Sequence, residues 1–470
     1  MPGRAIPTAA GRPQATPSIL AMTAPLVLSF WMRSAFTFVD TAYAATLGDA
    51  AIAAIGLAIP LEFLMIACWV GLSNGLTSCL SQAMGAGEGA RIQQLLGTAW
   101  KMITRALLPT FLALAAATGM IAPHLGLEPE VGRLFAVYGS VMLAGSALTG
   151  FWSILPDSLI KAHHDTRATM WAGIWSNVIN VLLNTIFLFL FHWGIFGIAF
   201  STVLGRFGGL LYALSRARRH EHARKSRGED QSLRLDNRPY GVILALALPS
   251  AAAYALMALE STFVNGVLAS TPAATAAIAA YSIYYRVLLF ASMPIIAASV
   301  ATLPYTARLF GRERLTEIRK GFLQVSLSAL AYALLLLIPA TWFGGPPLAR
   351  LLAEEPTTAA FAAFALRVIP VAVIVAIPFF LCRPIFEGMQ RGRPGLWIAL
   401  LRYLVLTVPL ALAGVKLSRA LGFPGFYGLI AGLVAATAIS SAWFQIWLML
   451  TLAGPRIGRE NTPTLPARAP

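Results

Sequence analysis

The stretch TFVDTAYAATLGDAAIAA, residues 37–54, sets the organisation of this chain because its outline occurs twice. About 225 residues later the chain reads TFVN at 262–265 and then AAIAA at 276–280. An alanine-rich sequence can repeat AAIAA by chance, but chance does not usually also place TFV at nearly the same distance before it. The match predicts two related halves, which differ where Asp40 of the first half is replaced by Asn265 in the second.

Other paired residues extend the repeat in both directions. Pro25 and Pro249 stand near the start of the first apolar segment of each half. Gly85 and Gly311 close the second segment of each half, just before a basic stretch. The two halves are therefore expected to share one helical layout.

The composition is that of a polytopic, all-α membrane protein. Of the 470 residues, 58% are hydrophobic and 11% are charged, and the mean hydropathy of +0.72 is too high for a soluble globular protein. A helix of roughly 20 apolar residues crosses about 30 Å of hydrocarbon. Segments of this kind predict twelve transmembrane helices, at 18–44, 50–83, 97–122, 131–160, 168–191, 194–216, 239–268, 273–307, 321–343, 357–382, 395–415 and 423–453.

The formal charge of +16 is a topology signal rather than a sign of nucleic-acid binding. Under the twelve-helix layout, Lys and Arg gather in the loops on the N-terminal side, and the opposite loops hold only Arg133, Arg350, Lys416 and Arg419. Cytoplasmic loops carry the basic excess in membrane proteins, so both termini are expected to be cytoplasmic. Contact with anionic lipid headgroups is a second use for the same residues.

Six segments per half return the chain to its starting side, so the halves form a parallel repeat with a pseudo-two-fold axis along the membrane normal. The predicted parts are a cytoplasmic tail, an N-terminal six-helix lobe, a charged cytoplasmic linker, a C-terminal six-helix lobe and a second cytoplasmic tail, at residues 1–17, 18–216, 217–238, 239–453 and 454–470. Two such lobes enclose a midplane cavity that alternating access opens to either side. The architecture predicts a secondary transporter.

The sequence gives no reason to expect a cofactor or a bound metal. No G-x-x-x-x-G-K-[ST] stretch is present to bind ATP, so an ion gradient is the expected energy source. Cys68, Cys79 and Cys382 lie in apolar segments without C-x-x-C spacing, which argues against a disulfide framework or a zinc site.

Five stretches carry a family resemblance through their order and spacing: FVDTAYAATLGDAAIAAIGLA (38–58), GLSNGLTSCLSQAMGAGE (71–88), NVLLN (180–184), GIFGIAFST (194–202) and AIAAYSIYYRVLLFASMPIIAASVATLPYTARLFG (277–311). They resemble the multidrug and toxic compound extrusion family. The resemblance implies twelve helices in two lobes that export small amphipathic compounds in exchange for inward H+ or Na+. A monomer in contact with membrane lipids, in the inner membrane of a bacterium, is expected from this class.

Three acidic residues lie well inside apolar segments: Asp40, Glu62 and Glu260. A carboxylate at the centre of a membrane helix costs roughly 2.5–3.5 kcal/mol on insertion scales, so such a residue needs a partner or a function. Asp40 is the strongest candidate for ion coupling, because access to water from either side would let it load and release a proton. The alternative is that Asp40 only hydrogen-bonds neighbouring helices and locks them together.

The resemblance also implies a cation site in the N-terminal lobe. Members with such a site use an acid in the first helix, N-x-x-x-D in the fifth and Thr in the sixth, and the matching residues here are Asp40, Asn180, Asn184 and Thr202. Asn184 stands where the pattern has an acid, which favours H+ over Na+; Na+ bound by carbonyl oxygens is the alternative. Pro25 matches a proline that is proposed to bend the first helix upon protonation. Interhelical hydrogen bonding is the alternative role for the two asparagines.

A substrate cavity is expected to be lined by Glu260, Arg33, Tyr281, Tyr284 and Met257. Rings and methionine sulfur suit irregular apolar cations, and the Glu260 carboxylate would attract them. The alternatives are helix packing for the rings and an ion pair between Glu260 and an intramembrane arginine such as Arg286. Arg33 lies seven residues before Asp40 and either acts on its charge or snorkels to the interface.

Three other classes of protein remain as alternatives. A major facilitator transporter also has parallel halves, but SQAMGAGEGARIQQ at 81–94 replaces its usual charged loop. A flippase for lipid-linked saccharides shares the two-lobe fold, and it is kept open by the intramembrane arginines Arg33, Arg206, Arg286, Arg367 and Arg402. A lipid-modifying membrane enzyme would need a polar cluster such as His163-His164-Asp165, which as a short cytoplasmic turn is expected to be solvated.

Overall fold

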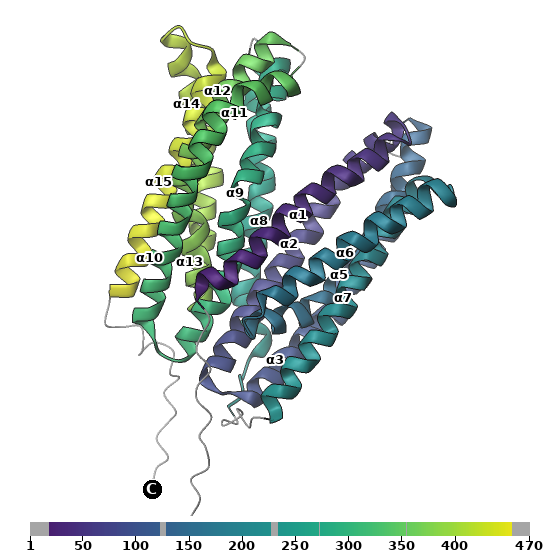
Figure 1. The fold of residues 1–470 in the computed structure, drawn as a ribbon, viewed down its shortest axis with the longest axis vertical. Coiled ribbons are helices and arrows are strands. Elements are labelled where there is room, and N and C mark those ends of the chain that lie inside the picture. The colour runs from purple at the N-terminus through teal and green to yellow at the C-terminus, as the bar shows by residue number, and fades with distance from the viewer. Residues whose placement is uncertain (1–17, 123–127, 227–233, 272, 354, 454–470) are drawn as a thin grey trace, which may run out of the picture.

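The structure is a computed structural model that describes residues 18–122, 128–226, 234–271, 273–353 and 355–453. Helices and short turns make up this part of the chain, and it contains no strand (Figure 1). In chain order the elements are α1 (Ile19–Ala45), α2 (Asp49–Ala86), α3 (Gly89–Met102), η1 (Ile103–Leu107), α4 (Leu108–Ile121), α5 (Pro129–Ala162), α6 (Thr166–Thr185), η3 (Ile186–Leu190), α7 (Gly194–Ser226), α8 (Pro239–Ala269), α9 (Ala274–Gly311), α10 (Leu315–Tyr332), η4 (Ala333–Leu337), α11 (Ile338–Leu352), α12 (Pro356–Gly388), α13 (Arg393–Leu400), η5 (Leu401–Leu406), α14 (Thr407–Ala420) and α15 (Gly425–Ala453).

The predicted all-α fold with twelve spans in two lobes is confirmed. Four spans are continuous helices interrupted by a π-helical turn: α3–η1–α4, α6–η3, α10–η4–α11 and α13–η5–α14. Eleven helices of the described chain are long and apolar enough to cross a membrane. The remaining helix, α1, has a shorter described apolar stretch, Ile19–Met32, because many side chains beyond it are outside the described part.

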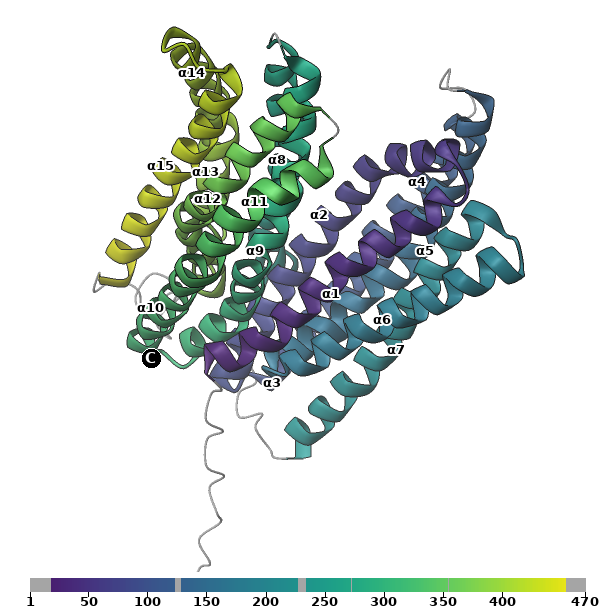
Figure 2. The same ribbon diagram turned by 45° about the horizontal axis from the view of Figure 1, so that its top comes forward.

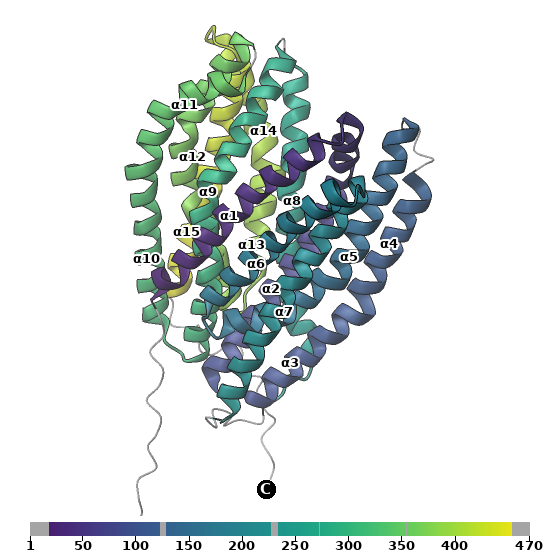
Figure 3. The same cartoon turned by 45° about the vertical axis from the view of Figure 1, so that its right-hand side comes forward.

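The helices form two bundles that lie side by side, α1–α7 and α8–α15 (Figures 1 and 2). The bundles meet at the end where α1 begins and α15 ends, and they diverge toward the opposite end (Figures 1 and 3). We call the shared end the closed end and the other the splayed end.

Each lobe repeats the irregularities of the other. A π-helical turn interrupts the third span of both lobes, at η1 and η4, and the fifth span of both lobes, at η3 and η5. Such turns are rare and often mark functional sites. Their recurrence in the third and fifth spans of both lobes fits one shared backbone plan, although η3 ends its span and η5 lies inside its span.

The second helix of each lobe packs on the first helix of the other. A methyl group placed on Gly71 of α2 would lie 2.8 Å from Cβ of Ala251 in α8, and one on Gly75 would lie 2.9 Å from the carbonyl oxygen of Ile243. Glycine therefore lets α2 approach the backbone of α8 closely, as small residues do between membrane helices.

The matching contact on the other side of the axis uses alanine. Ala297 and Ala301 of α9 stand at the positions that correspond to the two glycines of α2, 226 residues further along the chain. Both are fully buried in a cluster with Met22 and Leu26 of α1. The same helix pairing is thus kept with larger side chains on the partner helix.

The charged segment between the lobes differs in part from a simple loop. α7 continues to Ser226, past residue 216 where the linker was expected to begin. Arg216 contacts Asp165 at 2.8 Å, and Arg224 contacts Glu221 at 2.9 Å, so the extra turns are held by ion pairs. Residues 217–226 are therefore helical.

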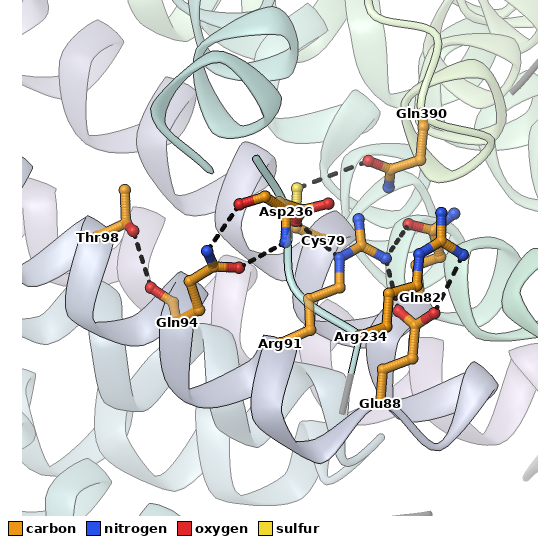
Figure 4. A network of polar contacts seen from close by, with 9 residues as sticks. All are labelled: Cys79, Gln82, Glu88, Arg91, Gln94, Thr98, Arg234, Asp236 and Gln390. Carbon is orange, nitrogen blue, oxygen red and sulfur yellow. Dashed lines mark hydrogen bonds and ion pairs between the residues drawn. The ribbon is translucent and has the colours of Figure 1, made fainter. Parts of the chain in front are cut away.

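The end of the linker before α8 is fixed to the N-terminal lobe (Figure 4). Arg91 of α3 contacts the Asp236 carboxylate at 2.8 Å and the Glu88 carboxylate at 2.8 Å. Gln94 donates to the carbonyl oxygen of Asp236 and accepts from its backbone N–H, both at 2.8 Å. This contact ties the start of the second lobe to the first at the closed end.

Candidate functional site

A buried polar cluster joins α6 and α7 in the N-terminal lobe. Asn180 donates from Nδ2 to the hydroxyl of Thr202 at 3.0 Å and, at 3.4 Å, to that of Ser201. The Ser201 hydroxyl lies 2.6 Å from Oδ1 of Asn184. Asn184 and Ser201 have no exposed surface. We call these four residues the α6–α7 cluster.

Local sequence explains why these side chains meet. Asn180 and Asn184 are four residues apart and therefore lie on one face of α6. Gly205 of α7 faces the same stretch of α6, since a methyl group on it would lie 2.9 Å from Cβ of Asn180. The π-helical turn η3 follows α6 directly. Ser201 was not predicted; its only sequence signal is that it precedes Thr202.

The first helix lies beside this cluster. α1 packs against α6 and against α9 of the other lobe. Asp40 and Arg33 belong to α1 by their backbone, and their side chains lie outside the described part of the structure. Pro25 lies inside α1, which runs as one helix from Ile19 to Ala45. The structure thus brings together three of the predicted residues: Asn180 and Asn184 on α6, which packs against α1, and Thr202 on the neighbouring α7.

The second intramembrane acid of the N-terminal lobe is hydrogen-bonded. The hydroxyl of Tyr138 in α5 donates to Oε1 of Glu62 in α2 at 3.3 Å. Arg206 of α7 donates to the Ser146 hydroxyl. Glu62 therefore has a structural partner within its own lobe.

The C-terminal lobe contains a pocket of about 80 Å³, part of it open at its mouth. It lies among α8, α9, α12, η5 and α15, and its lining residues are Met257, Glu260, Tyr281, Tyr284, Tyr285, Leu288, Leu289, Ser292, Ala372, Ala376, Phe380, Arg402, Tyr403, Leu433, Val434 and Thr437. The set includes Glu260, Tyr281, Tyr284 and Met257, which the sequence placed on a substrate cavity. We call it the C-lobe pocket.

A charged pair stands at the wall of this pocket. Glu260 of α8 lies 3.9 Å from a guanidinium nitrogen of Arg402 in η5, and the Thr407 hydroxyl lies 3.2 Å from Oε1 of Glu260. The Arg402 guanidinium also lies 4.5 Å from the ring centre of Phe379 and 4.8 Å from that of Tyr403.

The partner of Glu260 is therefore not the arginine named from the sequence. Arg286 of α9 is exposed, and Arg402 takes the place next to Glu260. A guanidinium therefore stands beside the carboxylate, so the C-lobe pocket does not present Glu260 as an isolated negative charge.

The closed end is held by polar contacts between the lobes. Asn74 of α2 donates to the Ser250 hydroxyl of α8 at 2.9 Å, and Arg383 of α12 donates to the same hydroxyl at 2.6 Å. Arg383 also pairs with Glu387 at 2.9 Å. The Ser78 hydroxyl of α2 donates to the Glu387 carbonyl oxygen at 2.6 Å. These bonds link α2 to α8 and α12.

Two turns bridge the lobes in matching ways. Nε2 of His164, in the turn after α5, lies 3.2 Å from the carbonyl oxygen of Pro304 in α9. Gln390, in the turn after α12, donates to the hydroxyl of Ser78 in α2 at 2.8 Å. Both bridging residues have positive φ, and each position in one contact stands 226 residues from its counterpart in the other.

The prediction that the turn His163-His164-Asp165 is solvated is wrong for both histidines. The side chain of His163 is 7% exposed and contacts Glu221 at 2.9 Å, and His164 is 7% exposed. Burial, together with the nearby Arg308 guanidinium, lowers the pKa of His164 to about 3. Hydrogen bonds from His220 and Arg216 hold the pKa of Asp165 well below its usual range. The turn is buried because it docks on α9.

Among the residues that the structure describes, no group of three or more His, Cys, Asp and Glu side chains is arranged to hold a metal ion. Cys68, Cys79 and Cys382 are free thiols.

The fold and these sites define an all-helical, two-lobe membrane transporter. The MatE family model matches residues 25–186 and 249–413, one match in each lobe. The chain belongs to this family, the MATE transporters, which are membrane transporters rather than enzymes.

Curated relatives and solved structures agree with this assignment. The chain is 24% identical to "Probable multidrug resistance protein YoeA" of Bacillus subtilis over 66% of this chain and 67% of that protein. It is 23% identical to "FAD transporter" of Shewanella oneidensis over 84% of this chain and 87% of that protein. The crystal structure of a mutant of the Vibrio cholerae MATE transporter VcmN is similar with a TM-score of 0.83 and 22% identity, over 93% of this chain and 97% of that chain.

Proposed function

We propose that this protein is a secondary antiporter that exports amphipathic, cationic organic compounds in exchange for inward protons. Relatives named as multidrug resistance proteins support multidrug efflux. The observation that carries the proposal is the buried α6–α7 cluster on the helix that packs against α1. Buried polar groups of this kind are costly unless they are hydrogen-bonded or functional.

The composition of the cluster supports H+ as the coupling ion. Its described members, Asn180, Asn184, Ser201 and Thr202, are neutral amides and hydroxyls. Asp40 of α1 would be the single titratable group added to them. A lone carboxylate that gains and loses one proton needs no further charged ligand, whereas Na+ among these neutral oxygen donors would have only that one carboxylate to offset its charge. Na+ coupling is the alternative that the experiment below separates.

The two lobes, residues 18–216 and 239–453, are proposed to rock against each other in alternating access. Basic loops gather on the side of the closed end, which the positive-inside rule assigns to the cytoplasm together with both termini. The splayed end then faces outward, and the bonds between α2, α8 and α12 form the closed cytoplasmic gate. A monomer in the bacterial inner membrane, in contact with lipid, completes the proposal.

The experiment is ethidium efflux from proteoliposomes with a proton gradient, comparing wild type with Asp40→Asn. We expect the wild type to transport ethidium and to dissipate the gradient, and Asp40→Asn to do neither, because the amide cannot titrate. Glu130→Gln, which removes an exposed acid at the start of α5, is the matched control and is expected to behave as wild type. Equal gradient-driven efflux by wild type and Asp40→Asn would remove Asp40 from coupling, and a requirement for Na+ over K+ would replace H+ by Na+.

The four intramembrane arginines whose side chains are described do not support the flippase alternative. Of the intramembrane arginines with described side chains, Arg286 and Arg367 are exposed, Arg206 bonds Ser146 in the N-terminal lobe and Arg402 pairs with Glu260 in the other. A shared cationic chamber for a pyrophosphate group is not formed by these four residues.

A further inference from the structure

The C-lobe pocket combines one loose ion pair with many hydrogen-bond donors. The pair between Glu260 and Arg402 is made at 3.9 Å, which is longer than the 2.8–2.9 Å of the ion pairs at the closed end. An Arg–carboxylate pair in good geometry is shorter and often bidentate. Neither charge of the pair is therefore fully compensated by the other.

Arg402 has a hydrogen-bond donor that lacks an acceptor. Its Nε is buried without a hydrogen-bond partner in the described structure, and its side chain is 14% exposed. A buried donor that lacks an acceptor costs about 1–3 kcal/mol, and more for a charged group. The rings of Phe379 and Tyr403 lie against the guanidinium, and no hydrogen bond joins the Tyr403 hydroxyl to Nε.

The rest of the wall suits an aromatic body with an acidic group. Tyr281, Tyr284 and Tyr285 of α9 line the pocket, and Glu260 and Arg402 are the charged groups that act on them electrostatically. Rings pack on an aromatic ligand, and phenol hydroxyls donate hydrogen bonds to a carboxylate. α12 and α15 add only uncharged lining residues.

We propose that the C-lobe pocket binds amphipathic aromatic compounds that carry a carboxylate or a similar acidic group, with Arg402 as the anion-binding residue. Glu260 competes with the ligand, because its carboxylate already compensates part of the positive charge of Arg402. The acidic group of the ligand must therefore interact with Arg402 more strongly than Glu260 does. The binding site itself does not depend on the proposed antiport, but its use in export rests on that function. The substrate range then includes acids as well as cations.

The test measures equilibrium binding by calorimetry, with purified protein in lipid nanodiscs and empty nanodiscs as the blank. The probe is 2-naphthoate, and 2-naphthamide and 2-naphthylmethyl-trimethylammonium are its neutral and cationic analogues. Wild type is expected to bind the acid more tightly than the amide.

Three variants separate charge from folding. Arg402→Gln is expected to weaken 2-naphthoate binding roughly tenfold or more, the loss of one charge-assisted hydrogen bond. Arg402→Lys is expected to retain part of the affinity, because it keeps the charge and loses the planar fork. Glu260→Gln is expected to tighten binding by roughly tenfold, since it removes a like charge beside the ligand. Arg367→Gln removes an exposed arginine of α12 in the same lobe and is the control.

The proposal would be overturned by 2-naphthoate binding that Arg402→Gln leaves unchanged in a folded, monodisperse sample, or by binding that Glu260→Gln weakens. Tighter binding of the cationic analogue than of the acid by wild type would also overturn it. No gradient is applied, so a failure of proton coupling at Asp40 would leave this pattern intact, and the two proposals fail independently.

Discussion

The two lobes of this transporter share a backbone and differ in their charges. Asp157 and Lys161 form an ion pair in α5 at 2.6 Å, and at the positions 226 residues further along the chain Arg383 and Glu387 form one in α12 at 2.9 Å. The order of the signs is reversed between the two pairs. The spacing of one helical turn is the same in both lobes, and the polarity of the pair is opposite.

The same division applies to the sites. The N-terminal lobe has a compact cluster of neutral amides and hydroxyls between α6 and α7. The C-terminal lobe has an open pocket with a charged pair and four tyrosines. The repeat thus supplies a scaffold, and under the proposed function the difference between Asp40 and Asn265 assigns the ion to the N-terminal lobe.

The largest expected effect comes from closing the space between α6 and α7. In Gly205→Ala the new methyl group would lie 2.5 Å from the carbonyl oxygen of Ser176, so the helices must separate, at a cost of about 3 kcal/mol. Thermal unfolding in nanodiscs measures the loss.

Gly97→Ala is the control for this change, because no atom lies within 4 Å of the new methyl group. It is expected to stabilise the helix by about 0.5–1 kcal/mol. If both variants were equally stable, close α6–α7 packing would not be what holds the cluster together.

The second effect is a pH dependence of stability that only one of the two bridging turns should show, the turn that contains His164. His164 has a pKa lowered to about 3 in the closed structure, so an opened or unfolded state binds the proton more readily. The contribution of neutral His164 to the free energy of unfolding is complete above the ordinary histidine pKa. This contribution declines as the pH falls from there toward 3. At about pH 5 the loss is about 2 kcal/mol.

Thermal unfolding at neutral pH and at about pH 5 tests this, because His164→Gln should lose less stability on acidification than wild type. His222→Gln, which removes an exposed histidine of α7, should lose as much as wild type. Gln390, the counterpart in the other lobe, does not titrate, so Gln390→Ala should leave the pH dependence unchanged. An identical pH response of wild type and His164→Gln would contradict the assignment.

The smallest effect concerns the linker, whose contact between Asp236 and Arg91 of the N-terminal lobe we call the latch. Asp236→Asn weakens the contact with Arg91 and is expected to lower stability by about 1 kcal/mol, because the carboxylate is 14% exposed and partly solvated. Arg234→Gln, whose side chain is 57% exposed, should cost less. A larger loss from Arg234→Gln than from Asp236→Asn would show that the latch depends on other contacts.

Much of the fold was readable from the sequence because hydropathy and a long-range repeat can both be seen in the residue order itself. All twelve spans were located, with ends that differ by up to ten residues, and the shared face of Asn180 and Asn184 follows from helical spacing alone. Which helix a side chain meets depends on how the helices rotate in the bundle, and no local pattern encodes this. Arg402, rather than Arg286, therefore became the partner of Glu260 only in three dimensions.

Burial of the cytoplasmic turns was hidden for a related reason. His163 and His164 belong to a short polar stretch that looks solvated, and their burial arises because the turn docks on α9 of the other lobe. Such docking is a property of the closed end as a whole. Ser201 likewise gained its role from the approach of α6.

The central claim is that the coupling ion binds in the N-terminal lobe. Proton release on ligand binding tests this claim most directly. Tetraphenylphosphonium is added to purified protein in weakly buffered solution with a pH indicator. Wild type should release protons, Asp40→Asn should release none, and adding Asn265→Asp to that variant should not restore the signal. Undiminished proton release by Asp40→Asn would contradict the account.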